Sequence, residues 1–440
     1  MNHMHFIGIG GTGMSGLAKM CLEKGIHVTG SDLKNSATVQ TLRDLGADIR
    51  IGHGLLPQSA GLVVYSTAVP EDNPELQAAR SRGIPLWHRR DMLRYLAEGK
   101  TVYGVAGAHG KTTTTTMLAE IFVKARRNPS IAAGGKLLFE GANGRYDKRG
   151  DVFIAELDES DGSFLQLDID SAIITNIDDD HLDFYGSKAN LDKAFGEFIE
   201  NVSGALVVNG MDETIMELVK GRDRLITFGL KDCDYTLGDI QVRNYRNTGK
   251  AYYHGKYIGT INLPLPGVHN LINALGAIAL ARDKHIPDEV IFKALDTFQG
   301  VGRRFEIVGQ KEGRTIVDDY AHHPNEIDAL LSGAKSFGYR RVISIFQPHR
   351  YTRTRQLYKD FVKVLKQSDL TIVTDIYSAG EDAIPGISGE SLAQDIGGIY
   401  LKSFQEITAF ILENSQEEDL ILTIGAGDVW EAGIMILEAL

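Results

Sequence analysis

Residues His5–Ala18 read HFIGIGGTGMSGLA, a glycine-rich loop between a strand-like apolar run and a helical pattern. Gly8, Gly10 and Gly13 have the spacing G-x-G-x-x-G. Asp32 ends the next apolar run. Such glycines let the backbone approach a diphosphate, whose charge the N-terminus of the following helix stabilises. The stretch therefore predicts a Rossmann-like α/β unit that binds a nucleoside diphosphate, either a dinucleotide or a UDP-sugar.

A second phosphate-binding pattern, GAHGKTT, occupies Gly107–Thr113, also between a strand-like run and a helical run. Val105 stands where the full G-x-x-x-x-G-K-[ST] motif has its first glycine, so the chain retains only the shorter G-x-x-G-K-T-T. Backbone N–H groups of such a loop can cradle a triphosphate. Lys111 can reach the β and γ phosphates, and the Thr112 hydroxyl can ligate Mg²⁺.

Two acidic clusters follow apolar runs in the middle of the chain. AELDESDGSF supplies Glu156, Asp158, Glu159 and Asp161, and TNIDDDHLDFYG supplies Asp178, Asp179, Asp180 and His181. The carboxyl ends of parallel strands meet at one edge of a sheet. Because Mg²⁺ prefers oxygen ligands, the two clusters predict a pocket for a metal ion and a triphosphate.

Cationic side chains gather in the last third of the chain. They are Arg303 and Arg304, His322 and His323, and His349, Arg350, Arg353 and Arg355. A guanidinium group pairs bidentately with a carboxylate or a phosphate. Their recurrence after two successive apolar runs predicts a site for an anionic substrate.

The length of 440 residues predicts about three domains. Strand-like and helical runs alternate, which predicts α/β domains over residues 1–99, 100–300 and 301–440: an N-terminal Rossmann-like domain, a central P-loop ATPase-like domain with a mostly parallel sheet, and a C-terminal Rossmann-like domain. The net charge of −12 argues against broad affinity for nucleic acid or an anionic membrane. No apolar run has the length of a membrane span, so we expect a cytoplasmic protein.

Motifs along the whole chain resemble those of the Mur ligase family. In chain order they include HFIGIGGTGMSGLA, GAHGKTTTT, DESDGSF, TNIDDDHLD, GVHNLINALGA, GVGRRFE, DDYAHHPNEI and FQPHRYTRTR. The resemblance implies three domains that bind a UDP-sugar, ATP with Mg²⁺, and an amino acid. It also implies that ATP activates the lactyl carboxylate of UDP-N-acetylmuramate as an acyl phosphate, which the amine of L-alanine attacks.

The resemblance further assigns roles to individual residues. For ATP it points to Gly107, Ala108, His109, Gly110, Lys111, Thr112, Thr113, His269, Asn273 and Arg304, and for the metal ion to Thr112, Glu156 and His181, with Glu159 as a third acidic residue. For UDP it points to Gly10, Gly11, Thr12, Gly13, Asp32, His53 and Ser66, and for L-alanine to Tyr320, His322, Arg350 and Arg353. The catalytic residues are then Lys111, Glu156, His181, His322 and Arg350.

Two positions depart from the family pattern. Ala108 stands where most members carry threonine, which removes one hydroxyl near the phosphates. Phe195 and Gly196 stand where the later ligases of the family place a carbamylated lysine, so we predict no lysine carbamate.

Several alternatives stay open on the sequence alone. An NAD-dependent dehydrogenase would use the first glycine loop but would leave the second loop unexplained. A ligase that recycles murein tripeptide shares the chemistry of the first two domains, and a non-catalytic nucleotide-binding regulator would share the loops. Our candidate for the general base is His322, with His181 or a phosphate oxygen as competitors. We expect a monomer or a weak homodimer.

Overall fold

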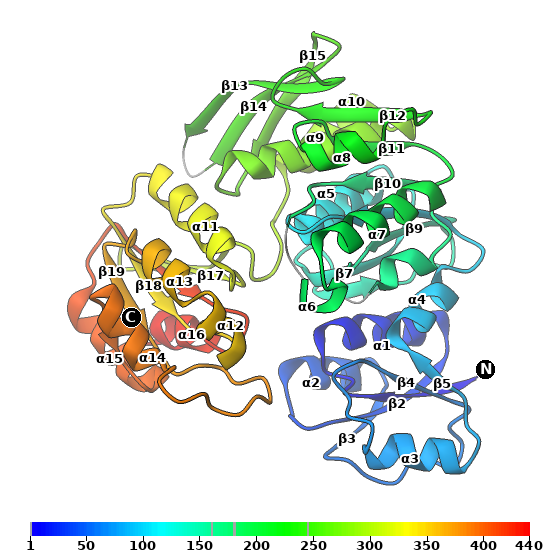
Figure 1. The fold of residues 1–440 in the computed structure, drawn as a ribbon, viewed down its shortest axis with the longest axis horizontal. Helices are drawn as coiled ribbons and strands as arrows, with labels where there is room; N and C mark the ends of the chain where they lie inside the picture. The colour runs from blue at the N-terminus through cyan, green and yellow to red at the C-terminus, as the bar shows by residue number, and fades with distance from the viewer. Residues whose placement is uncertain (1, 160–161, 179–181, 244–245) are drawn as a thin grey trace. The chain divides into compact units, whose positions relative to one another are not determined.

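The computed structural model describes residues 2–159, 162–178, 182–243 and 246–440, which form three sheets flanked by helices (Figure 1). The contact pattern separates two compact units. The first contains the residues up to Asp239 with Gly249–Asn262 and Leu271–Gln299, and the second contains Ile240–Thr248, Leu263–Asn270 and Gly300–Leu440. The expected α/β class with mostly parallel sheets is confirmed, whereas the limits of the three domains stay predictions.

The first sheet is parallel throughout. In spatial order its strands are β3 (Asp48–Ile51), β2 (His27–Asp32), β1 (His3–Ile7), β4 (Leu62–Tyr65) and β5 (Leu86–His88). Its helices are α1 (Thr12–Lys24), α2 (Ala37–Asp44), α3 (Pro74–Ser81) and α4 (Arg89–Ala97). The strand order reverses between β1 and β4, so the loops after these two strands border the crevice where α/β sheets bind ligands.

The second sheet has ten strands. In spatial order they are β15 (Lys256–Leu263), β14 (Arg246–Tyr253), β13 (Tyr235–Arg243), β12 (Leu225–Gly229), β11 (Leu206–Asn209), β10 (Ser171–Ile174), β6 (Thr101–Ala106), β9 (Val152–Glu156), β7 (Ser130–Leu137) and β8 (Ala142–Arg145). The helices are α5 (Lys111–Lys124), α6 (Leu182–Tyr185), α7 (Lys188–Asn201), α8 (Glu213–Leu218), α9 (Val268–Asp283) and α10 (Asp288–Asp296), with a 3₁₀ turn at Ser163–Gln166. The strands from β12 to β7 pair in parallel, so the loops after β6, β9 and β10 leave the sheet at the same edge.

The third sheet lies in the second unit. Its order is β16 (Glu306–Lys311), β17 (Arg314–Asp319), β21 (Asp419–Ile424), β18 (Arg341–Phe346), β19 (Leu370–Val373) and β20 (Ile399–Tyr400). The helices are α11 (Pro324–Ser336), α12 (Tyr351–Gln356), α13 (Tyr358–Leu365), α14 (Gly389–Ile396), α15 (Phe404–Asn414) and α16 (Trp430–Ala439). Only the pairing of β16 with β17 is antiparallel, so the loops after β17, β18 and β21 share one edge.

The helices are short, and within the described ranges none combines the length and hydrophobicity that crossing a bilayer requires. The least typical of them is α5, because it contains five consecutive β-branched threonines, Thr112–Thr116. All five are buried. The Thr116 hydroxyl donates to the carbonyl of Thr112 at 2.7 Å, and the Thr114 hydroxyl donates to that of Gly110 at 2.9 Å. Burial and these local hydrogen bonds offset the low helix propensity of the run.

A buried glutamate on α5 makes the stability of the first unit depend on pH. Glu120 is 4% exposed, and its Oε2 has no hydrogen-bond partner among the described residues. Burial raises the pKa of Glu120 to about 7. The pKa of such a carboxyl group is higher in the folded state than in the unfolded state. The folded state therefore loses stability as the pH rises from the unfolded-state pKa to the folded-state pKa. Stability should therefore fall between about pH 4.5 and about pH 7.

We expect Glu120→Gln to remove this fall. Relative to the unsubstituted protein, the variant should gain roughly 2–3 kcal/mol between about pH 4.5 and about pH 8, since one pKa unit corresponds to about 1.4 kcal/mol. Urea unfolding at the two pH values measures the difference. Glu197→Gln, an exposed glutamate on α7, is the matched control and should change nothing. An equal effect of Glu120→Gln at both pH values would contradict the titration.

Candidate functional site

The glycine loop after β1 is held in shape by the end of β2. The Asp32 carboxylate accepts hydrogen bonds from the N–H of Gly10 at 2.8 Å and from that of Lys34 at 3.0 Å. A Cβ atom on Gly10 would lie 2.9 Å from this carboxylate, so the contact requires glycine. Helix α1 begins at Thr12 with Gly11 as its N-cap. Asp32 therefore fixes the shape of the loop at the N-terminus of α1.

A buried glutamate that no local motif indicates lies beside this crevice. Glu75 is 1% exposed and accepts hydrogen bonds from the Ser31 hydroxyl and the Gly54 N–H, with His53 Nδ1 at 3.8 Å. Burial alone would raise the pKa of Glu75, but interactions with His5, Ser31 and Gly54 hold it below its usual value.

The other two predicted UDP residues are Gly13, which lies against the Arg89 guanidinium, and Ser66, which directly follows β4.

The second glycine loop joins β6 to α5 and is held by the two residues after β10. Thr175 Oγ1 and Asn176 Nδ2 donate to the carbonyl of His109 at 2.6 and 2.9 Å. The His109 N–H donates back to Asn176 Oδ1 at 2.9 Å. Gly107 has a φ of +129°, and a Cβ atom there would lie 2.2 Å from Thr175 Oγ1. Our sequence reasoning missed Thr175 and Asn176, although their place directly after an apolar run was the available signal.

Lys111, the first residue of α5, has its ammonium group among oxygen atoms. Its Nζ donates to the carbonyls of Gly107 and Ala108 at 2.7 and 3.1 Å. It also forms a 2.8 Å ion pair with Glu159, which is 2% exposed. Burial would lower the pKa of Lys111, but the Glu159 carboxylate raises it above its usual value. The loop therefore holds a permanent cation at a helix N-terminus, the arrangement that favours phosphate.

The Thr112 hydroxyl and the Glu156 carboxylate lie in contact at the end of β9. Thr112 Oγ1 donates to Glu156 Oε1 at 3.0 Å, and the Gly134 N–H donates to Oε2 at 2.5 Å. Burial raises the pKa of Glu156, so a nearby cation would stabilise its charged form. Hydroxyl and carboxylate oxygens suit Mg²⁺, which usually keeps several waters. The described residues hold no group of three or more potential metal ligands, and the predicted ligand His181 lies outside them.

Gly134 sets the position of the Glu156 carboxylate, since a Cβ atom there would lie 2.4 Å from Glu156 Oε1. We expect Gly134→Ala to displace the carboxylate and to lower kcat/KM for MgATP by about 10- to 100-fold. Steady-state kinetics at varied MgATP measures the effect. Gly196→Ala on α7, where a Cβ atom meets nothing closer than 3.9 Å, is the matched control. Unchanged kinetics in Gly134→Ala would show that the carboxylate position does not matter.

Helix α9 brings Asn273 to the phosphate loop. Gly110 has a φ of +81°, and a Cβ atom there would lie 2.6 Å from Asn273 Nδ2. Asn273 is 7% exposed. Thr113, another residue predicted to bind ATP, is buried within α5. His269 also lies on α9 but belongs to the second compact unit. Of the two predicted residues on this helix, Asn273 is therefore the one that the first unit places beside the loop.

In the second unit, the ring of His322 is oriented by two acceptor oxygens. Its Nδ1 lies 3.0 Å from the Tyr320 carbonyl oxygen and 3.5 Å from Glu326 Oε2. A carbonyl oxygen accepts only, so Nδ1 carries the proton and Nε2 keeps its lone pair. Burial lowers the pKa of His322 below its usual value despite the charge of Glu326. At neutral pH this imidazole is uncharged and able to accept a proton at Nε2.

Glu326 is a further residue that our sequence reasoning missed. Its Oε2 accepts hydrogen bonds from the N–H groups of His322 and His323 at 3.0 and 3.3 Å. Its Oε1 lies 3.4 Å from Arg304 Nη1. The available signal was the capping pattern of α11, in which His323 is the N-cap and Glu326 the third helical residue. Glu326 therefore connects the predicted base to the predicted phosphate contact.

The adjacent residues Arg303 and Arg304 have different surroundings. Arg303 Nε pairs with Asp318 at 2.8 Å, and its two terminal nitrogens donate to the carbonyls of Gly427 and Gly425 at 3.0 and 2.6 Å. These three acceptors come from the end of β17 and the loop after β21, so Arg303 ties the two together. Arg304 contacts Glu326 and also lies over the Tyr320 ring, with its guanidinium carbon 5.5 Å from the ring centroid.

The predicted alanine-binding arginines lie at the start of α12. Arg353 Nη1 donates to His349 Nδ1 at 3.3 Å, and Arg350 Nη1 lies 3.7 Å from Glu381 Oε1. Burial, reinforced by Arg353, His322 and Arg350, lowers the pKa of His349 to about 4, so this ring is neutral. The rings of His322 and His349 are 6.2 Å apart. Within the second unit, Arg353 is thus brought near the predicted base, and Arg350 is turned to Glu381.

Comparison with known proteins covers nearly the whole chain. Three family models match in succession: the Mur ligase family catalytic domain at residues 3–101, the Mur ligase middle domain at 105–281, and the Mur ligase glutamate ligase domain at 303–427. The UDP-N-acetylmuramate–L-alanine ligase of Pelotomaculum thermopropionicum is 45% identical over 450 residues, which cover 100% of this chain and 97% of that protein.

Two solved structures resemble the model. The UDP-N-acetylmuramate-alanine ligase MurC of Thermotoga maritima matches with a TM-score of 0.87 and 31% identity, covering 99% of this chain and 98% of that one. A murein peptide ligase of Psychrobacter arcticus matches with a TM-score of 0.73 over 100% of this chain and 98% of that one, and at 23% identity it shows the shared fold. Over nearly its whole length, in sequence and in fold, the chain belongs to the Mur ligase family.

Proposed function

We propose that this protein is an ATP-dependent ligase that joins L-alanine to the lactyl carboxylate of UDP-N-acetylmuramate and releases ADP and phosphate. Relatives at 41–45% identity over nearly the full chain are named UDP-N-acetylmuramate–L-alanine ligases. The structural observation that carries the proposal is the phosphate loop with Lys111 and the Thr112–Glu156 pair at one edge of a sheet. Enzymes of the Mur ligase family use ATP.

The phosphate loop would bring two negatively charged reactants together. A free carboxylate is a poor acylating agent, and its phosphorylation supplies the leaving group. Lys111, whose ammonium is held by oxygen atoms of the loop and Glu159, would exchange the loop carbonyls for phosphate oxygens and offset the repulsion between ATP and the carboxylate. Thr112 and Glu156 would hold Mg²⁺, which supplies charge neutralisation on the phosphates.

The first sheet would hold the UDP-sugar. Its diphosphate suits the loop of Gly10, Gly11, Thr12 and Gly13 at the N-terminus of α1. Asp32 is engaged with this loop, so its contribution is to fix the cradle at the uridine end. Ser66 follows β4, whose loop borders the crevice, and the carboxylate of Glu75 would orient the ring of His53, which follows β3.

The second unit would bind L-alanine and take up its proton. Arg350 and Arg353 suit the amino-acid carboxylate, and Tyr320 and His322 lie close by. The ammonium group must lose a proton before it can attack, and His322 Nε2 is the acceptor that the geometry offers. Attack on the acyl phosphate gives a tetrahedral intermediate, and the amide forms when phosphate leaves. Arg304 would contact the phosphate group.

Phosphate release from ATP and Mg²⁺ tests this function. We expect release only when UDP-N-acetylmuramate and L-alanine are both present, with one amide formed for each phosphate. Release that is independent of either co-substrate would refute the ligase. Murein tripeptide as the acceptor should give little product, and preference for it over L-alanine would favour the recycling ligase instead. Tight binding of NADH would favour a dehydrogenase.

We also propose that the reaction takes place in the cytoplasm, because its ATP and UDP-sugar substrates are made there. A monomer or a weak homodimer is the assembly that we propose for it. Sedimentation at working concentrations would measure that assembly directly.

A further inference from the structure

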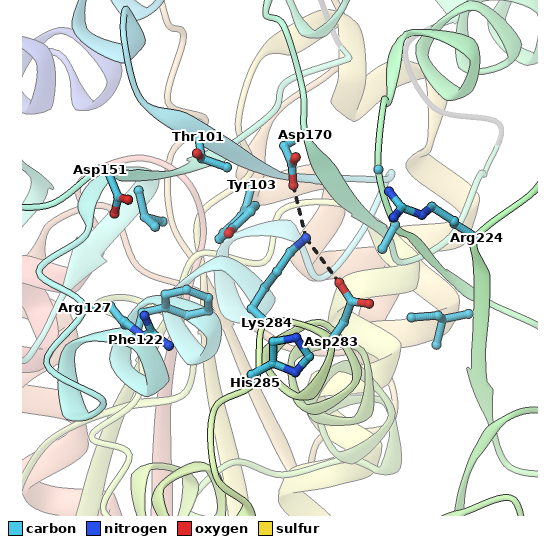
Figure 2. A pocket seen from close by; sticks show the side chains of 14 residues that line it. Thr101, Tyr103, Phe122, Arg127, Asp151, Asp170, Arg224, Asp283, Lys284 and His285 are labelled. Carbon is cyan, nitrogen blue, oxygen red and sulfur yellow. Dashed lines mark hydrogen bonds and ion pairs between the residues drawn. The ribbon is translucent and has the colours of Figure 1, made fainter.

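A hollow of about 660 Å³ opens at the amino ends of the parallel strands of the second sheet (Figure 2). It lies wholly in the first unit. Thr101, at the start of β6, lines it, whereas the phosphate loop follows Ala106 at the other end of that strand. The hollow is therefore at the opposite edge of the sheet from the proposed ATP site. Its volume is in the range of small-molecule sites, roughly 300–1,000 Å³.

The hydroxyl of a largely buried tyrosine faces this hollow. Tyr103 is 7% exposed, and its hydroxyl has no hydrogen bond with any residue that the structure describes. Its ring packs on Phe122 at 5.5 Å and under the ammonium group of Lys284 at 5.1 Å. Burial, with the charges of nearby aspartates, raises the pKa of Tyr103 to about 12, so the hydroxyl stays protonated. The hydroxyl is open to the hollow, so it can donate a hydrogen bond to a ligand there.

Some charged side chains of the hollow are paired with each other, and the others are exposed to solvent. Lys284 pairs with Asp170 at 3.1 Å and with Asp283 at 3.2 Å. Arg127 and Asp151 are exposed and have no side-chain hydrogen bond or ion pair with any described residue. The charge of Asp151 raises the pKa of Tyr103, and that of Arg127 lowers it. Figure 2 shows these two on one side of Tyr103 and Lys284 on the other.

Arg224, across the hollow, is a second guanidinium without a side-chain partner among the described residues. The lining thus offers two available cations and one available carboxylate. A ligand that carried only negative charge would leave Asp151 facing like charge. A ligand with an ammonium group and two anionic groups satisfies all three side chains, and the Tyr103 hydroxyl can donate to one of its oxygens.

We propose that this hollow is an effector site for a small zwitterion of dipeptide size, with carboxylates on Arg127 and Arg224, an ammonium group on Asp151, and the Tyr103 hydroxyl as a hydrogen-bond donor. The site is separate from the reacting groups of the proposed ligase. It is connected to them because β6, α5 and α9 each reach from the hollow to the phosphate loop. A ligand in the hollow would order the ends of β6, α5 and α9 that lie there, and this would change the affinity for ATP at their other ends.

Calorimetric titration of the full chain with glycyl-L-glutamate tests the proposal. We expect a Kd of about 1 mM and a change of about threefold or more in the affinity for ATP. Arg127→Gln and Tyr103→Phe should each weaken dipeptide binding, by about tenfold and about fivefold. Arg126→Gln, a neighbouring exposed arginine that does not line the hollow, is the matched control and should leave it unchanged. N-acetylglycyl-L-glutamate keeps both carboxylates but lacks the ammonium group, and it should bind more weakly.

Three results would overturn the proposal. The first is an absence of saturable binding up to about 10 mM dipeptide. The second is binding that survives Arg127→Gln but is lost in Arg350→Gln, which would place the dipeptide at the proposed alanine site. The third is an affinity for ATP that the dipeptide does not change. None of these results bears on ligase turnover itself, so the proposed function is tested separately.

Discussion

Lys111→Met should abolish amide synthesis, with kcat lower by about 10³-fold. The substitution keeps the length and the apolar stem of the side chain but removes the only charge that the loop offers to the phosphates among its described residues. It also leaves the buried Glu159 carboxylate without its 2.8 Å ion pair. The ammonium group contributes most when charge develops on the transferring phosphoryl group, so kcat should fall more than the affinity for ATP.

Single-turnover measurement of ADP formation with UDP-N-acetylmuramate and L-alanine present checks this expectation. Lys124→Met, at the other end of the same helix, is the matched control because its side chain is exposed. It should leave turnover within about twofold of the unsubstituted protein. A Lys111→Met variant that is folded and retains more than about a tenth of the normal kcat would exclude the assigned role.

His322→Gln should lower kcat by about 10²- to 10⁴-fold, the range for loss of a general base. The base acts in its neutral form, and burial holds the pKa of His322 below 6.5. The unsubstituted enzyme should therefore keep its activity down to about pH 6.5 and lose it below the folded-state pKa. This loss of activity at low pH is the acidic limb of the pH profile, and the variant should lack it.

A pH profile of kcat from about pH 5 to about pH 9 measures both effects. His323→Asn is the matched control, because asparagine retains N-cap ability at the start of α11. Glu326→Gln is a second informative variant. The charge of Glu326 raises the pKa of His322, so its removal should shift the acidic limb to lower pH, which loss of packing alone would not do. An acidic limb that persists in His322→Gln would assign the proton acceptor to another group.

The sequence predicted the elements that are built from neighbouring residues. The two glycine loops, each between a strand and a helix, are local patterns, and the structure places them after β1 and after β6. The resemblance in motif order predicted the family, which the comparisons confirm. The loop anchors were not predicted, because Thr175 and Asn176 are 66 and 67 residues from His109, which they hold.

Residues with the same local sequence signal also have different contacts in the structure. Arg303 and Arg304 are adjacent and chemically identical, yet Arg303 is fully engaged by acceptors that lie 15 to 124 residues away. Glu75 shows the converse, since nothing in its local sequence marks it, but Ser31 and His53 converge on it from other elements. The roles of the individual site residues stay predictions that the variants above are designed to test.

By itself, the sequence determined where the two glycine loops turn tightly and in what order the three α/β regions follow one another. Those properties depend on contiguous residues, because a loop of defined backbone shape requires glycines at fixed spacing. Only the tertiary structure decided which carboxylate faces Lys111, which acceptors engage each of two adjacent arginines, and which nitrogen of His322 keeps its lone pair. These properties depend on hydrogen-bond partners that folding brings from distant parts of the chain.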